Sequence, residues 1–110
     1  MTVDFNNIEE DIIPNFLNGD GSVAGKMFVD DAGKILVARI GKGSSIGLHR
    51  HETNYEVEFV VQGKAKCTCD GVVEILEPGM CHYCPNGSQH IMESIGDEDL
   101  VLYCVVPNCK

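Results

Sequence analysis

Closely spaced turn signals divide most of the chain into short extended segments, and no other feature of the sequence constrains the fold as strongly. Runs of β-branched, aromatic and other apolar residues are separated by Gly, Pro, Asn and Asp, as at Asp70-Gly71, which suits a two-residue hairpin turn. No amphipathic helical pattern interrupts the series. We expect strands over residues 26–29, 35–40, 55–62, 64–69, 72–76, 81–84, 90–95 and 100–106. This regular spacing predicts an all-β sandwich or barrel.

Length and composition predict a single domain. The chain has 110 residues, of which 44% are hydrophobic, enough to form one core. Residues 15–25 contain three glycines and are expected to form a loop. The predicted organisation is an N-terminal arm over residues 1–24, packed on the barrel or on a dimer partner, and a barrel domain over residues 25–110.

The charge balance excludes some classes of partner. The formal net charge is -9 at pH 7, with only 8 Lys and Arg residues against 17 Asp and Glu. Nucleic acids and anionic membranes require a basic surface, so neither is an expected partner. Residues 1–13 are acidic and contain no apolar run typical of a signal peptide or a membrane span. The expected location is the cytoplasm.

The six cysteines allow more than one interpretation. A disulfide framework requires a secretory context, so we expect free thiols. A second zinc site remains open, because Cys67 and Cys69 share one strand face and Cys81-x-x-Cys84 lies in another strand. Small buried apolar roles are predicted for Cys67, Cys81 and Cys104, and an exposed thiol for Cys109.

Three of the four histidines and one glutamate are spaced as candidate metal ligands. His49 and His51 are two residues apart on an extended segment, so their side chains point to the same face. Glu56 follows after a short turn, and His90 comes from much later in the chain. Three imidazoles and one carboxylate suit a transition-metal ion better than a four-thiolate zinc site or an oxygen-only calcium site.

These residues form a two-part frame that resembles the pair of motifs defining the cupin superfamily. Nine positions match with the gaps that the family shows, and they read Gly43-x5-His49-x-His51-x4-Glu56-x6-Gly63 and Gly79-x5-Pro85-x-Gly87-x2-His90. Ser94 stands where the second motif usually closes with Asn. The resemblance implies a small single-domain cupin, a jelly-roll β-barrel with the metal inside.

The resemblance and the ligand types imply one divalent metal ion per chain, which could be Mn, Fe, Ni, Co or Zn. Three neutral imidazoles and one carboxylate leave a divalent ion with a net charge of about +1, which favours an anionic or chelating oxygen ligand. A small-molecule ligand is therefore the expected partner.

Strand alternation extends the prediction to the neighbours of Glu56. If Glu56 faces the interior, so does Glu58, whereas Val57, Phe59 and Val61 face outward. An apolar outer face requires cover from the N-terminal arm or from a second copy, and we expect a homodimer. Glu58 is a candidate catalytic acid or base, unless a local twist turns it to solvent.

Other site candidates follow from the same alternation. Met92 and Ser94 share the parity of His90 and are candidates for substrate binding. Arg39 could bind a substrate carboxylate through its planar guanidinium group. For His82 a surface or packing role is favoured over metal ligation.

Two classes of function fit these predictions. One is a metal-dependent enzyme, a dioxygenase, isomerase, decarboxylase or lyase, acting on an oxygen-rich small molecule. The other is a non-catalytic cupin that binds or senses a sugar or a carboxylate. The fold alone does not choose between them.

Overall fold

The computed structural model describes residues 1–109, and among these the regular structure is almost entirely β. Two short 3₁₀ helices, η1 (Phe5–Asn7) and η2 (Phe16–Asn18), lie near the N-terminus. The strands are β1 (Asp11–Pro14), β2 (Ser22–Asp30), β3 (Gly33–Ile40), β4 (Ser45–Arg50), β5 (Glu56–Gln62), β6 (Ala65–Cys69), β7 (Val72–Leu76), β8 (Cys81–Cys84), β9 (Gln89–Ser94) and β10 (Leu100–Pro107). The all-β prediction is confirmed.

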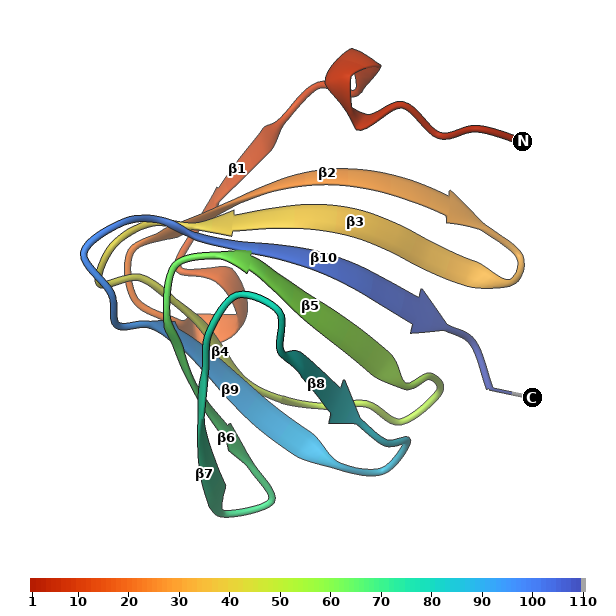
Figure 1. Cartoon of the computed structure of the whole chain (residues 1–110). Helices are drawn as coiled ribbons and strands as arrows, with labels where there is room; N and C mark the ends of the chain where they lie inside the picture. Colours follow the sequence, from red (N-terminus) through yellow and green to blue (C-terminus); the bar gives the residue numbers. More distant parts are fainter. Residues whose placement is uncertain (110) are drawn as a thin grey trace.

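The strands form two antiparallel sheets that face each other (Figure 1). The larger sheet has the order β1-β2-β3-β10-β5-β8, and the smaller has the order β4-β9-β6-β7. Neighbours distant in sequence, such as β3 and β10 or β4 and β9, give the crossed connections of a jelly roll. The buried core between the sheets includes Ile40, Val60, Ala65, Cys67, Met92, Leu100 and Leu102.

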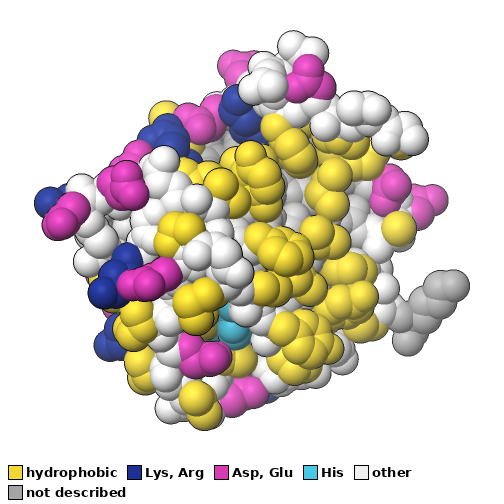
Figure 2. All heavy atoms as spheres, viewed as in Figure 1, with side chains coloured by type: hydrophobic (Ala, Val, Ile, Leu, Met, Phe, Trp, Pro, Cys, Tyr) yellow, Lys and Arg dark blue, Asp and Glu magenta, His cyan; other side chains and the backbone are white. Residues whose placement is uncertain are grey.

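Alternation along β5 follows the sequence prediction. Glu58 and Val60 are only 1% and 3% exposed, whereas Phe59 and Val61 are 47% and 46% exposed. Glu58 therefore points between the sheets rather than to solvent. The side chains of Phe59 and Val61 belong to the outer face of the larger sheet, where Figure 2 shows hydrophobic side chains gathered over β3, β10 and β5.

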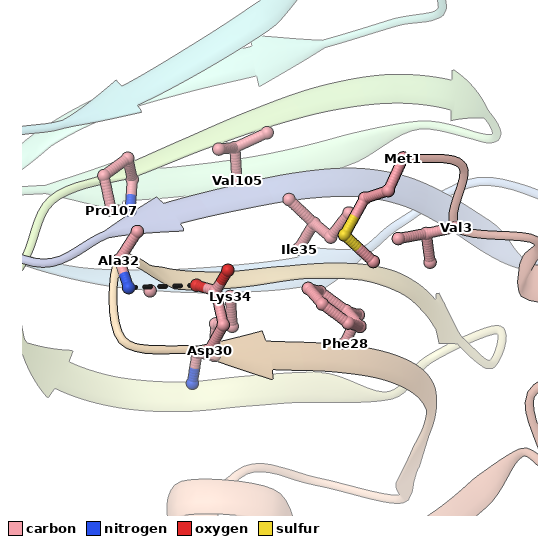
Figure 3. Close-up of a pocket in the computed structure, with 10 residues that line it drawn as sticks. Met1, Val3, Phe28, Asp30, Ala32, Lys34, Ile35, Val105 and Pro107 are labelled. Carbon is pink, nitrogen blue, oxygen red and sulfur yellow. Dashed lines mark hydrogen bonds between the residues drawn. The ribbon is translucent and has the colours of Figure 1, made fainter.

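A shallow groove of about 350 Å³ lies on this outer face, on the opposite side of the sheet from the histidines. Met1 and Val3 contact it from the N-terminal segment, beside Phe28 and Ile35 (Figure 3). Its lining is mostly apolar and holds no set of metal-ligating side chains, so we treat the groove as part of the outer apolar surface.

Two local predictions are wrong. The loop expected over residues 15–25 ends earlier, because Ser22 already belongs to β2, which pairs with β1 on one side and β3 on the other. Cys81 is exposed rather than buried, because on β8 His82 and Cys84 face inward and Cys81 faces outward. All six cysteines are free thiols, and Cys109 is exposed as predicted.

No helix among residues 1–109 is both long enough and apolar enough to cross a membrane.

Candidate metal centre

The four predicted ligands come together between the two sheets. His49 comes from β4, His51 lies just beyond its end, Glu56 begins β5 and His90 lies in β9. The Nε2 atom of His90 lies 3.0 Å from Nε2 of His49 and 3.0 Å from Nε2 of His51. Glu56 Oε1 lies 3.2 Å from Nε2 of both His51 and His90. We call these four residues the metal cluster.

A bulge in β4 positions His49. The pairing of β4 with β9 shifts register between Ile46 and His49, which brings His49 directly opposite His90. Gly47 lies in this bulge, against the η2 segment. A Cβ atom at position 47 would lie 1.8 Å from the carbonyl oxygen of Leu17, so only glycine allows this approach.

Each histidine of the cluster is held by a second contact through its other ring nitrogen. His49 Nδ1 lies 2.8 Å from the Gly47 carbonyl oxygen, and His51 Nδ1 lies 2.5 Å from Asn54 Oδ1. Both partners are acceptors, so both Nδ1 atoms carry the proton and donate. In neutral His49 and His51, Nε2 is therefore a bare lone pair directed into the cluster.

Burial and the short distances between the ligand atoms shift the pKa values of residues in the metal cluster. Burial by itself raises the pKa of Glu56, but contacts with His51 and His90 outweigh burial and lower this pKa to about 2. The contact with Glu56 raises the pKa of His51, whereas burial lowers the pKa of His49. The pKa shifts of Glu56 and His51 apply when His51 and His90 carry a proton on Nε2 and share it with the carboxylate. When the imidazoles are neutral with the proton on Nδ1, the carboxylate meets their lone pairs instead, and a cation in the centre would offset the repulsion.

The distances within the cluster fit a metal ion. With bonds of about 2.1 Å, neighbouring ligands of an octahedral ion lie about 3.0 Å apart and those of a tetrahedral ion about 3.4 Å apart. The observed separations of 3.0 and 3.2 Å lie within this range. The metal cluster can therefore hold a transition-metal ion, with coordination positions left for another molecule.

Behind His90 lie two buried side chains. The Nε2 atom of His82 is 3.0 Å from His90 Nδ1, and Glu58 Oε1 is 3.6 Å from the same nitrogen. Glu58 Oε1 forms no hydrogen bond among the described residues. Burial first, and then the charge of Glu56, raise the pKa of Glu58 well above its ordinary value, which favours its neutral form.

Sequence reasoning missed the contact of His82 with His90. His82 is only 4% exposed, and on β8 it lies opposite Glu58 of β5. The sequence shows that His82 and Cys84 share one face of their strand, but it does not show that this face points inward, and the prediction of a buried Cys81 implied the opposite. The pairing of β8 with β5 is not visible in the sequence either, and that pairing brings His82 behind His90.

The predicted substrate-binding residues do not all lie on the same side as the metal cluster: Met92 and Ser94 face the interior, and Arg39 faces outward. Met92 and Ser94 are buried on the His90 side of β9, and within the described part of the chain Ser94 Oγ has no hydrogen-bond partner. Arg39 lies on the outer face, where it contacts Glu10 at 2.6 Å and Asp99 at 3.1 Å. These ion pairs already use its guanidinium group, and Arg39 is not brought to the metal cluster.

Comparisons with known proteins agree with this architecture. The oxalate-binding protein of Thermotoga maritima is 28% identical over 68 residues, which cover 62% of this chain and 56% of that protein. Mannose-1-phosphate guanylyltransferase of Escherichia coli is 35% identical over 63 residues, which cover 57% of this chain but 13% of the enzyme. The chain thus spans a minor part of that enzyme and about half of the oxalate-binding protein.

Solved structures show the same fold. The crystal structure of a predicted oxalate decarboxylase from Thermotoga maritima has a TM-score of 0.92 and 24% identity, and the match covers 99% of this chain and all of that one. A family model described as "Cupin domain" matches residues 36–106, which include all four residues of the metal cluster. The chain therefore belongs to the cupin family.

Proposed function

We propose that this protein binds one divalent transition-metal ion through His49, His51, Glu56 and His90 and uses it to hold a small, oxygen-rich anion such as a dicarboxylate. The observation that carries the proposal is the convergence of imidazole nitrogens and a carboxylate oxygen within 3.0–3.2 Å of His90 Nε2. Because His49 and His51 donate outward through Nδ1, they contribute lone pairs and no protons to the centre.

Charge and coordination favour a chelating oxyanion. Three neutral imidazoles and one carboxylate leave the bound ion with a net charge of about +1. Four protein ligands would leave coordination positions open on an ion that takes more than four ligands, and adjacent oxygens of one small molecule would bind there. The similarity to an oxalate-binding protein supports a small dicarboxylate as this ligand.

The residues around the metal cluster would orient the ligand and exclude water. Met92, which shares the inner face of β9 with His90, is 1% exposed, so water has little access to this side of the metal cluster. A low dielectric strengthens the attraction between the cationic centre and an anion. The ion itself would supply Lewis-acid polarisation of a bound oxygen.

The second candidate function is catalysis, by decarboxylation, dioxygenation, isomerisation or elimination. The position of Glu58 favours this function. Its carboxyl group is buried, burial raises its pKa, and its Oε1 lies 3.6 Å from His90 Nδ1, on the side away from the cluster. We propose that Glu58 acts through the His90 ring, whose orientation and basicity it influences, rather than directly on the ligand.

Metal analysis of the protein purified without added metal tests whether the metal cluster binds an ion. We expect about one transition-metal ion per chain, and loss of the ion in His49→Ala and His90→Ala. Leu48→Ala is the matched control, because Leu48 is exposed and adjacent to His49. Full metal occupancy in both histidine variants would exclude the proposed centre.

Calorimetric titration with oxalate and other small dicarboxylates tests whether the bound ion holds an anion. We expect binding to the metal-loaded protein and none to the metal-free protein. Oxygen uptake and product analysis with the same compounds then separate an enzyme from a binding protein. Equal affinity with and without metal would contradict the proposed role of the ion.

A further inference from the structure

A second group of metal-ligating side chains lies beside the metal cluster. Cys69 of β6, His82 of β8 and Cys84 of β8 each offer one ligand atom, and these atoms all lie within 4.8 Å of one another. β6 and β8 belong to different sheets, so the group spans the gap between them. We call these three residues the thiol cluster.

The backbone register fixes the thiol cluster next to the metal cluster. Cys69 pairs with His90 across β6 and β9, and Cys84 pairs with Glu56 across β5 and β8. Both cysteines are therefore held by strands rather than by loops. A third thiol, Cys67, also lies within 4.8 Å of His82 and His90.

The chemistry of the two cysteines favours cation binding over nucleophilic catalysis. Burial, with a smaller effect of Cys69, raises the pKa of Cys84 to about 12, and burial also raises the pKa of Cys69. Both are therefore neutral thiols in the metal-free protein and poor nucleophiles. A thiophilic cation displaces the thiol protons and binds the resulting thiolates.

His82 has one nitrogen available for such a cation. Its Nε2 lies 3.0 Å from His90 Nδ1 and is used in that hydrogen bond. Its Nδ1 lies 4.0 Å from Glu74 Oε1, which is too far for a hydrogen bond. Two thiolates and an imidazole nitrogen are ligands typical of zinc, and they leave one tetrahedral position open.

We propose that Cys69, Cys84 and Nδ1 of His82 form a second cation site, selective for a thiophilic ion such as Zn²⁺. The two thiol protons pass to solvent as the ion binds, so the site gains two negative charges that match the charge of the cation. This site does not depend on the proposed function of the metal cluster.

The hydrogen bond between His82 and His90 couples the two sites. When His90 Nε2 binds an ion, His90 Nδ1 carries the proton and donates to His82 Nε2, so neutral His82 carries its own proton on Nδ1. When His82 Nδ1 binds an ion, the donor is His82 Nε2, and neutral His90 carries its proton on Nε2. The two ions therefore require opposite proton positions on the same hydrogen bond, so each ion weakens the binding of the other. This coupling does rest on the proposed metal cluster.

Titration with Cd²⁺ tests the thiol cluster, because thiolate-to-cadmium charge transfer absorbs in the near ultraviolet and imidazole or carboxylate ligation does not. The starting protein carries Cys81→Ser and Cys109→Ser, which remove the two exposed thiols. We expect an absorption band that saturates at about one Cd²⁺ per thiol cluster. Absence of this band in the folded protein would overturn the proposal.

Further variants show which thiols give rise to the Cd²⁺ absorption band. Cys69→Ser and Cys84→Ser, checked for folding by circular dichroism, should each lose most of it. His49→Ala should keep it, because His49 belongs to the metal cluster alone. If Cys69→Ser and Cys84→Ser are folded and retain the full band, the proposed ligands are wrong, whatever the metal cluster binds.

Competition between the two ions tests the coupling. Mn²⁺ prefers oxygen and imidazole ligands over thiolates and should fill only the metal cluster. We expect Mn²⁺ to lower the Cd²⁺ affinity of the thiol cluster by about tenfold, the scale of effects from outer hydrogen bonds. The same Mn²⁺ concentration should have no effect in His49→Ala. Equal Cd²⁺ affinity with and without Mn²⁺ in a protein that binds Mn²⁺ would overturn the coupling.

Discussion

At the scale of single residues, the buried position of Glu58 is unfavourable for stability. Glu58 is 1% exposed, its Oε1 has no hydrogen-bond partner among residues 1–109, and the charge of Glu56 raises its pKa further than burial alone. Selection for folding stability alone would favour an apolar residue at this buried position. The presence of Glu58 behind His90 is consistent with the role that we propose for it.

Glu58→Gln should stabilise the metal-free protein at neutral pH and flatten its pH dependence. The ordinary pKa of the carboxyl group is 4.5, and burial raises it in the folded state. Between these two values the unfolded chain binds fewer protons than the folded chain, so stability falls as pH rises and is constant above the folded-state pKa. Glutamine does not ionise, so we expect a gain of about 1–3 kcal/mol at neutral pH.

Denaturant unfolding of both proteins at a series of pH values measures this effect. The difference in unfolding free energy should vanish below pH 4.5 and grow with rising pH. A difference that is independent of pH would mean that Glu58 is ionised equally in both states.

Asn54 gives a second prediction at this scale, because its Oδ1 accepts the proton of His51 Nδ1. Asn54→Ala removes the acceptor and should lower metal affinity by about tenfold, whereas Asn54→Asp keeps an acceptor at the same place. Competition with a chelator of known affinity measures both variants. Equal affinity in Asn54→Ala and the unmodified protein would show that His51 needs no such partner.

At the scale of elements, the bulge of β4 connects the N-terminal segment to the metal cluster. Asp20 and Ser45 exchange hydrogen bonds, with Asp20 N donating to Ser45 Oγ and Ser45 N donating to the Asp20 carbonyl oxygen. The Gly47 carbonyl oxygen accepts from His49 Nδ1. The residues before β2 thus hold the strand that carries His49.

Gly47→Ala should therefore reduce both stability and metal affinity. The added Cβ would meet the Leu17 carbonyl at 1.8 Å, and relieving the clash moves η2 or the bulge, at a cost of about 1–3 kcal/mol. Gly25→Ala is the matched control, because nothing lies within 4 Å of a Cβ at that strand position. Thermal unfolding and chelator competition measure the two effects, and equal behaviour of the two variants would contradict this account.

Alternation within one strand could be predicted from the sequence, whereas partners across strands could not. The separation of two residues between His49 and His51, and the alternation of Glu58 with Phe59, follow from strand geometry alone. The contact of His82 with His90 depends on which strand β8 pairs with, and β1 depends on its pairing with β2. Such long-range pairings leave no periodic signal in the segments themselves.

At the scale of the whole molecule, the outer face of the larger sheet carries exposed apolar side chains beyond the groove that Met1 and Val3 line. Tyr103 pairs with Phe59 on one side and Val37 on the other, and Val105 pairs with Val57 and Ile35, so apolar rows cross three strands. The N-terminal arm does not cover β5, because β1 pairs with β2, and β3 and β10 lie between β2 and β5. We propose that a second copy of the chain covers this face.

Phe59→Asp should convert the proposed homodimer to a monomer, because a buried carboxylate without a partner is costly at an apolar interface. Light scattering at micromolar concentration should give the dimer mass for the unmodified protein and for Val73→Asp, a control on the exposed edge strand β7 of the other sheet. A monomer in the unmodified protein would contradict the proposal. Because Phe59 points away from the metal cluster, Phe59→Asp should still bind one metal ion, and retained metal binding would distinguish dissociation of the dimer from unfolding of the chain.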